Sequence, residues 1–146
     1  MIRRLLACAT LIMTLACRSE RLGPYSPPSE AQRNTTKAEQ LNRDGADLIA
    51  SEPAKAEALL RDALTADIFF GPAHNNLGVV FLAQQKLYEA ASEFEWARKL
   101  MPGHPDPRVN LALCMERAGR TDDAIASYRR AQIILGVIHR EVRVQA

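Results

Sequence analysis

The sequence predicts an all-α fold in which about three helical hairpins stack into a solenoid. The first observation is a repeat of 34 residues, visible in three columns of equivalent positions. The columns are Ala56, Ala90 and Ala124; Leu60, Phe94 and Tyr128; and Ala63, Ala97 and Ala131. A period of this size indicates stacked helical hairpins. The second observation is that residues 75–102 hold two amphipathic helical patterns back to back. At 146 residues with 47% hydrophobic content, the chain can form one domain with a core.

Residues 1–16 precede this array and predict an export signal. Arg3 and Arg4 give a basic start, and an uncharged run from Leu5 to Ala16 follows. The run is too short for a spanning helix, which needs about 20 residues.

The end of the signal, Thr14-Leu15-Ala16-Cys17, resembles the lipobox of bacterial lipoproteins. This resemblance implies that Cys17 becomes the acylated first residue, so that a lipid anchors the protein to a membrane and the chain faces the periplasm. In the lipoproteins of Gram-negative bacteria that this signal resembles, Asp directly after the acylated Cys favours retention at the inner membrane. Here that position is Arg18, so the resemblance favours the outer membrane. The alternative is an ordinary signal cut after Ala16, since Thr14 and Ala16 also satisfy a small-x-small site.

Residues 17–36 predict a flexible tether. The segment is polar, contains Pro24, Pro27 and Pro28, and has no apolar period. As a flexible coil it would hold the folded part roughly 25 Å from the lipid.

The three repeat units are residues 37–70, 71–104 and 105–138, and they resemble the tetratricopeptide repeat family. The second unit carries the motif series Leu77, Gly78, Phe81, Ala90, Phe94, Ala97 and Pro102. The third has Ala112 in place of the Gly and Gly136 in place of the Pro. The resemblance implies a right-handed solenoid of helix-turn-helix hairpins. The first unit departs from the pattern, because Gly45 falls one place late unless the turn near Ser51 is one residue shorter.

Small residues in the repeat predict where helices approach closely. Gly78 on a first helix and Ala90 on a second let the two backbones of a hairpin come near, since larger side chains would wedge them apart. Phe81 and Phe94 fill the space around these contacts. Thr36 with Glu39 reads as a capping box at the start of the first helix.

Catalytic, metal and cofactor signatures are absent from the sequence. It has no Gly-rich phosphate loop, no paired His or Cys spacing and no Ser elbow, so we expect a protein that is not an enzyme and holds no metal or cofactor. We expect His74 and His104 to be solvated or capping, and Cys114 to be a small buried hydrophobe. Lys and Arg number 19 against 17 Asp and Glu, and the excess lies in the leader, so nucleic-acid binding is not predicted.

The first helices of such hairpins line a concave face. The family's groove positions, carried onto this chain, predict a partner-binding groove that is mostly apolar with an amide at one end. The predicted groove residues are Asn42, Ala46, Ile49, Asn75, Val79, Leu82, Val109, Leu113 and Glu116. An extended or helical apolar segment would suit this surface. The alternative is that Val79, Leu82 and Leu113 pack on neighbouring helices.

Two further features are possible docking anchors. Trp96 lies on a second helix where the family usually has a polar residue, so its indole either faces outward or covers a neighbouring hairpin. Phe69 and Phe70 lie in the turn between the first two units and either pack beneath the first hairpin or protrude. Residues 139–146 are a C-terminal tail or short cap, with extension of the last helix past Gly136 or fraying as the other possibilities.

These observations predict a non-catalytic scaffold or adaptor of the bacterial cell envelope that binds an envelope protein. A pilotin-like assembly factor for a pilus or secretion apparatus is the alternative function. An enzyme or small-ligand binder is the third hypothesis, and it would need a deep polar pocket that this pattern does not predict.

Overall fold

The computed structural model describes residues 33–144, which form six helices and no strand. The helices are α1 (Thr35–Leu48), α2 (Pro53–Ala66), α3 (Gly71–Ala83), α4 (Leu87–Leu100), α5 (Asp106–Arg117) and α6 (Thr121–Val144). The predicted all-α class is therefore confirmed. The export signal, Cys17 and tether residues 17–32 lie outside the described residues, whereas Thr35 and Thr36, the last two residues of the predicted tether, belong to α1.

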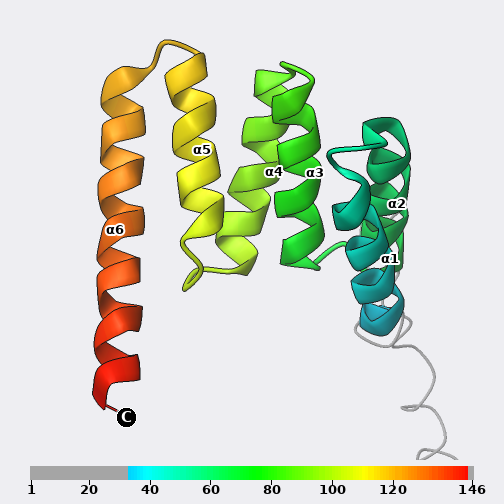
Figure 1. Cartoon of the computed structure of the whole chain (residues 1–146), viewed down its shortest axis with the longest axis horizontal. Coiled ribbons are helices and arrows are strands. Elements are labelled where there is room, and N and C mark those ends of the chain that lie inside the picture. The colour runs from blue at the N-terminus through cyan, green and yellow to red at the C-terminus, as the bar shows by residue number, and fades with distance from the viewer. Residues whose placement is uncertain (1–32, 145–146) are drawn as a thin grey trace, which may run out of the picture. The chain divides into compact units, whose positions relative to one another are not determined.

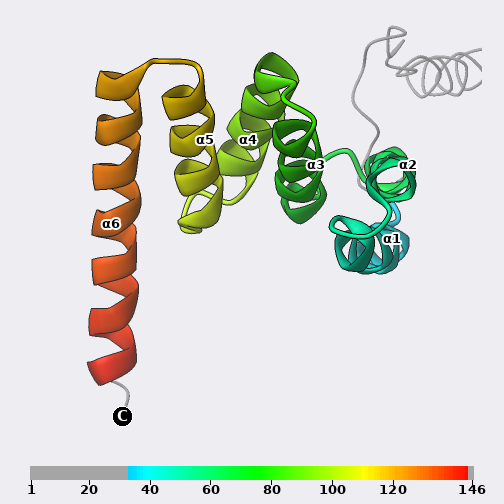
Figure 2. The same ribbon diagram turned by 45° about the horizontal axis from the view of Figure 1, so that its top comes forward.

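The helices pair in chain order into three antiparallel hairpins, α1 with α2, α3 with α4, and α5 with α6 (Figure 1). Each second helix also contacts the first helix of the next hairpin. Successive hairpins are rotated relative to one another, since Figure 2 shows α1 and α2 nearly end-on while α5 and α6 lie along the plane. This arrangement is the predicted solenoid.

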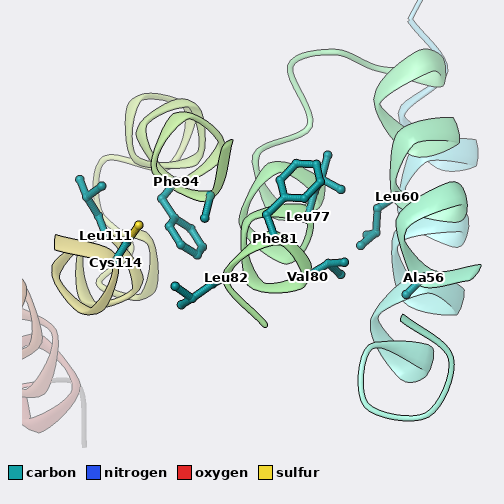
Figure 3. Close-up of a cluster of buried hydrophobic side chains, with 10 residues drawn as sticks. Ala56, Leu60, Leu77, Val80, Phe81, Leu82, Phe94, Leu111 and Cys114 are labelled. Atoms are coloured by element: carbon teal, nitrogen blue, oxygen red, sulfur yellow. The ribbon is translucent and has the colours of Figure 1, made fainter. Parts of the chain in front are cut away.

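The main core runs through the hairpins around Phe94, which is fully buried. Figure 3 shows Phe94 from α4 among side chains of α3 and α5, with Leu77, Phe81 and Leu82 on one side and Cys114 on the other. Burying an aromatic ring of this size stabilises the fold by roughly 3 to 5 kcal/mol relative to Ala. The core therefore depends most on the columns that repeat every 34 residues.

The irregular first hairpin follows the same packing rule with a one-residue shift. A Cβ on Gly45 would lie 3.0 Å from Cγ of Leu60, as a Cβ on Gly78 would meet the ring of Phe94. Leu60 follows Gly45 by 15 positions, whereas Phe94 follows Gly78 by 16. The segment between the glycine and the large side chain that it contacts is thus one residue shorter in the first hairpin. This shorter segment explains why Gly45 falls one place late in the repeat.

The start of α1 differs from the predicted capping box. Thr36 and Glu39 do not cap this helix; Asn34 does, and its side chain accepts a hydrogen bond from the backbone N–H of Lys37 at 2.9 Å. The cap lies two residues earlier because Asn34 also donates its backbone N–H to the carbonyl of Ala66, which anchors α1 beside the end of α2. At the other end, α6 continues past Gly136 to Val144, as in the extended-helix possibility.

Candidate interaction groove

The nine predicted groove residues lie on or at the end of the first helices of the three hairpins. These helices, α1, α3 and α5, contact one another directly in that order. The repeat places them side by side because each hairpin presents its first helix to the same side. The surface they form is called here the first-helix face.

A ladder of asparagine amides joins the three first helices. The Nδ2 of Asn76 donates to the Oδ1 of Asn42 at 2.9 Å, and the Nδ2 of Asn110 donates to the Oδ1 of Asn75 at 3.0 Å. Asn42 is only 9% exposed, so its amide mainly links α1 to α3. The carbonyl oxygens of both predicted groove amides, Asn42 and Asn75, are therefore used within the array.

The apolar groove residues divide by exposure. Leu82 is buried within the core cluster, and Ile49, Val79 and Leu113 are half-buried and pack against that cluster. Val109 is 36% exposed. Leu82, Val79 and Leu113 therefore all pack on the core, as in the packing alternative, and only Leu82 is fully buried. The accessible apolar surface on this face is carried by Val109 with the outer parts of half-buried neighbours, including Ala46.

The C-terminal end of the first-helix face is polar and connected to α6. A carboxylate oxygen of Glu116 accepts a hydrogen bond from the hydroxyl of Tyr128 at 3.1 Å. Burial, together with the bond to the Glu116 carboxylate and its charge, raises the pKa of the Tyr128 hydroxyl. Arg117 donates to the backbone carbonyl of Leu82 at 3.2 Å, so α5 and α3 are tied at this end as well.

The environment of His74 was predicted wrongly. Its side chain is buried, with Nδ1 2.6 Å from a carboxylate oxygen of Glu93 and Nε2 2.8 Å from the carbonyl oxygen of Ile68. Both partners are acceptors, so the ring donates at both nitrogens only when it carries both protons. The position near the start of α3 suggested solvent, but Glu93 on α4 and the preceding turn enclose the ring. His104 is exposed, beside Asp106.

Trp96 is both partly exposed and partly packed. Its indole stacks on the His74 ring at a centroid distance of 5.9 Å and an interplanar angle of 19°, and the residue is 47% exposed. The Lys99 ammonium lies 5.4 Å from the indole centroid. One face of the indole thus covers its own hairpin, and the other side of the residue remains accessible.

The turn carrying Phe69 and Phe70 is held by a buried carboxylate that the sequence analysis missed. Asp67 accepts hydrogen bonds from Nε and Nη2 of Arg33 at 2.8 and 3.0 Å and from the Thr35 hydroxyl at 2.8 Å. Burial raises the pKa of the Asp67 carboxyl, but these bonds and one from the Phe69 N–H outweigh it, and the pKa lies below its ordinary value. The signal for this pair was the 34-residue spacing of Arg33 and Asp67.

Both phenylalanines of this turn are half-buried. Phe70 packs beside Ala38, Ala63 and Ala73 in a small cluster beneath the first hairpin. The ring of Phe69 lies 5.2 Å from the guanidinium carbon of Arg33. Of the two alternatives predicted for this turn, packing beneath the first hairpin describes Phe70. The residue of the turn that is exposed is Ile68, at 48%.

Cys114 is buried, as predicted, and its thiol donates to the carbonyl of Leu87 at 3.0 Å. Burial raises the pKa of this thiol, which disfavours the reactive thiolate. Within residues 33–144 no group of three or more His, Cys, Asp or Glu side chains is placed to hold a metal ion. None of the helices in this described range is long and apolar enough to cross a membrane.

A model of the tetratricopeptide repeat matches residues 48–105 and 75–136, which together make up more than half of the chain. The chain belongs to the tetratricopeptide repeat family. The two matches overlap by one hairpin, as expected when each match covers about two tetratricopeptide units. The first of them begins at residue 48, after Gly45, and includes the second half of the irregular first unit.

Solved structures with the tetratricopeptide architecture align well at low identity. MamA aligns with a TM-score of 0.66 at 21% identity over 73% of this chain, which spans 63% of MamA. The first TPR of Spaghetti (RPAP3), bound to the HSP90 peptide SRMEEVD, gives 0.68 at 15% identity over 70% of this chain and 82% of its own.

A third similar structure is SycD, the type III secretion translocator chaperone of Yersinia enterocolitica. It gives a TM-score of 0.67 at 17% identity over 80% of this chain and 89% of its own. The TM-scores establish a shared fold, and at these low identities the similarity shows the fold alone. No curated protein sequence matches the chain significantly.

Proposed function

We propose that this tetratricopeptide protein is a non-catalytic adaptor of the bacterial cell envelope that binds a segment of a protein partner. The observation that carries the proposal is the first-helix face, where α1, α3 and α5 lie side by side and Val109 is exposed among half-buried apolar neighbours. Repeat arrays use such extended faces to bind other proteins. A polypeptide segment with an apolar anchor beside Val109 fits this surface.

The envelope location rests on the sequence. The basic and apolar features of residues 1–16 support export, and the lipobox-like ending supports a lipid on Cys17. A short tether would then keep the array near a membrane surface facing the periplasm, with the outer membrane favoured.

Similar structures supply modest support for a protein partner. The Spaghetti domain was solved with a bound peptide, and SycD is described as a chaperone of a secretion translocator. The second of these agrees with the alternative function, a pilotin-like assembly factor. Finding a secretin subunit among captured proteins would favour that alternative over a general adaptor.

The test is crosslinking of the native chain in its own cells, followed by quantitative mass spectrometry. The variant is Val109→Glu, because Val109 is exposed enough to accept a charge, whereas Val79 and Leu113 pack against the core. The matched control is Ile133→Glu, on the exposed side of α6 at 67% exposure.

We expect one envelope protein to be captured by the native chain and by the Ile133 variant but lost with Val109→Glu. Circular dichroism must show the same helix content in all three chains. Capture that is unchanged in the Val109 variant would remove the first-helix face as the contact and leave Trp96 and the Ile68 turn as the next surfaces to test.

A further inference from the structure

A charged cleft lies away from the first-helix face, between α4, α5 and α6. Figures 1 and 2 both show α5 lying between the other two helices. The cleft has a volume of about 240 Å³, and three arginines from three different helices line it, Arg98, Arg108 and Arg130. It is called here the arginine cleft.

The acidic residues of the arginine cleft do not neutralise all three arginines. Glu95 accepts two hydrogen bonds from Arg98, at 3.0 and 2.6 Å, and Asp123 pairs with Arg120, which is outside the lining. Arg108 donates only to the neutral backbone carbonyls of Pro102 and His104. Within residues 33–137, neither Arg108 nor Arg130 forms an ion pair with a carboxylate.

Like charges therefore meet in a partly enclosed space. Burial lowers the pKa of Arg108, and the neighbouring Arg98 and Arg130 lower it further, while Glu95 acts in the opposite direction. The three guanidinium groups line one small cleft and repel one another, and Arg108, which is half-buried, is the least screened by water. An anion in the cleft would relieve this repulsion.

We propose that the arginine cleft binds an acidic side chain of a protein partner, with Arg108 and Arg130 holding its carboxylate. Glu95 pairs with Arg98 and Asp123 pairs with Arg120, so the two positive charges of Arg108 and Arg130 are without a paired carboxylate, and a partner's carboxylate could accept hydrogen bonds from both. Guanidinium groups match the planar carboxylate through paired hydrogen bonds. Leu111 and Met115, which also line the cleft, would contact the aliphatic part of a Glu side chain.

This proposal rests on the proposed function in one respect, namely that the partner is a protein. The arginine cleft is lined by residues of α4, α5 and α6 and does not include Val109, so substitutions in the cleft leave Val109 unchanged. Loss of partner capture with Val109→Glu and loss of acid binding with cleft variants are thus separate outcomes.

The experiment uses the full-length chain in mild detergent and an array of short peptides. Every peptide that contains Asp or Glu is paired with a twin in which these are Asn or Gln, and the best pairs are then measured by fluorescence anisotropy. We expect the acidic member to bind about tenfold or more tightly than its twin, as charged hydrogen bonds predict.

Arg108→Gln with Arg130→Gln should remove that preference. The matched control is Lys55→Gln with Arg61→Gln, which makes the same charge change on exposed α2 positions and should retain it. Arg130→Gln alone should melt at the same or a higher temperature than the native chain, because it relieves repulsion without breaking a bond to a carboxylate.

Four results would overturn the proposal. The first is equal binding of acidic peptides and their amide twins, and the second is an acid preference that survives both cleft substitutions. The third is inorganic phosphate binding the native chain as tightly as the best acidic peptide, which would make the cleft a site for a free oxyanion. A lower melting temperature for Arg130→Gln would likewise assign that arginine a purely structural role.

Discussion

A Cβ atom on Gly78 would lie 2.6 Å from Cε1 of Phe94, so the α3 backbone and the aromatic ring of α4 occupy adjoining space with no room for a methyl group. Phe94 is fully buried and cannot move into solvent. The close approach of the two helices in the middle hairpin depends on this pair.

Gly78→Ala should therefore destabilise the protein by about 1 to 3 kcal/mol, the usual cost of overpacking. The sign of this change in the free energy of unfolding is informative, because replacing Gly by Ala in an unobstructed helix stabilises it by about 1 kcal/mol. Gly136→Ala is the matched control, since nothing lies within 4 Å of a Cβ there and the residue is within α6. Urea unfolding followed by circular dichroism measures both. Equal effects of the two substitutions would contradict the packing account.

Asp67→Asn should lower the free energy of unfolding by about 1 to 3 kcal/mol at pH 7, because the charged hydrogen bonds from Arg33 weaken. Asp62→Asn, at an exposed position of α2, the helix that ends just before Asp67, should change it by less than about 0.5 kcal/mol. The measurement is the urea midpoint of each variant.

The same pair predicts a pH dependence. The pKa of Asp67 is lower in the folded chain than its ordinary value of 3.8, so its contribution is complete above that value and is lost as the pH falls through the folded pKa. The stability difference between the native chain and Asp67→Asn should thus be constant from about pH 7 to 5 and shrink below about pH 4. A difference that grows on acidification would show that the assigned direction is wrong.

His74→Leu should destabilise the protein by about 1 to 3 kcal/mol, because it leaves the Ile68 carbonyl and Glu93 without their ring partner. It should also shift the emission of Trp96, which stacks on that ring and is the only tryptophan of the chain. His104→Leu, at an exposed position, is the control and should leave the emission unchanged. Thermal unfolding with fluorescence detection tests both statements in one experiment.

Cys17→Ser should release the protein from membranes into a soluble fraction, because the residue that would carry the lipid is lost. Cell fractionation with detection of the chain in each fraction measures this. Cys114→Ser is the control, since that buried thiol lies within the array. Membrane association that persists in Cys17→Ser would rule out the lipid anchor.

The repeat period was enough to predict the fold and its main contacts. Gly78, Ala90 and Phe94 recur in columns, so their close packing follows from the need to stack equal hairpins. The buried polar groups were harder to predict, because His74 is enclosed by Glu93 and a turn whose path is set only in three dimensions. The groove residues were located on the expected helices, but burial of Asn42 and Leu82 depends on how far neighbouring hairpins rotate.

Spacing did contain one signal that was not used. Asn42, Asn76 and Asn110 are separated by 34 residues, as are Arg33 and Asp67. Equivalent positions of stacked units lie next to one another, so polar residues at this spacing predict hydrogen bonds between hairpins. The 34-residue spacing predicts the bond between Asn42 and Asn76 and the pair of Arg33 with Asp67, whereas Asn110 bonds Asn75, which is 35 positions away and outside the column.

The asparagine ladder also bears on how such a chain can change length. The middle hairpin donates an amide to the unit before it through Asn76 and accepts one from the unit after it through Asn75. A duplicated copy of that hairpin would bring its own donor and acceptor, so it could be inserted beside the original without leaving an unmatched amide at either junction. The middle unit is thus equipped to be copied, and gene duplication could lengthen the array at this point while preserving the bonds on both sides.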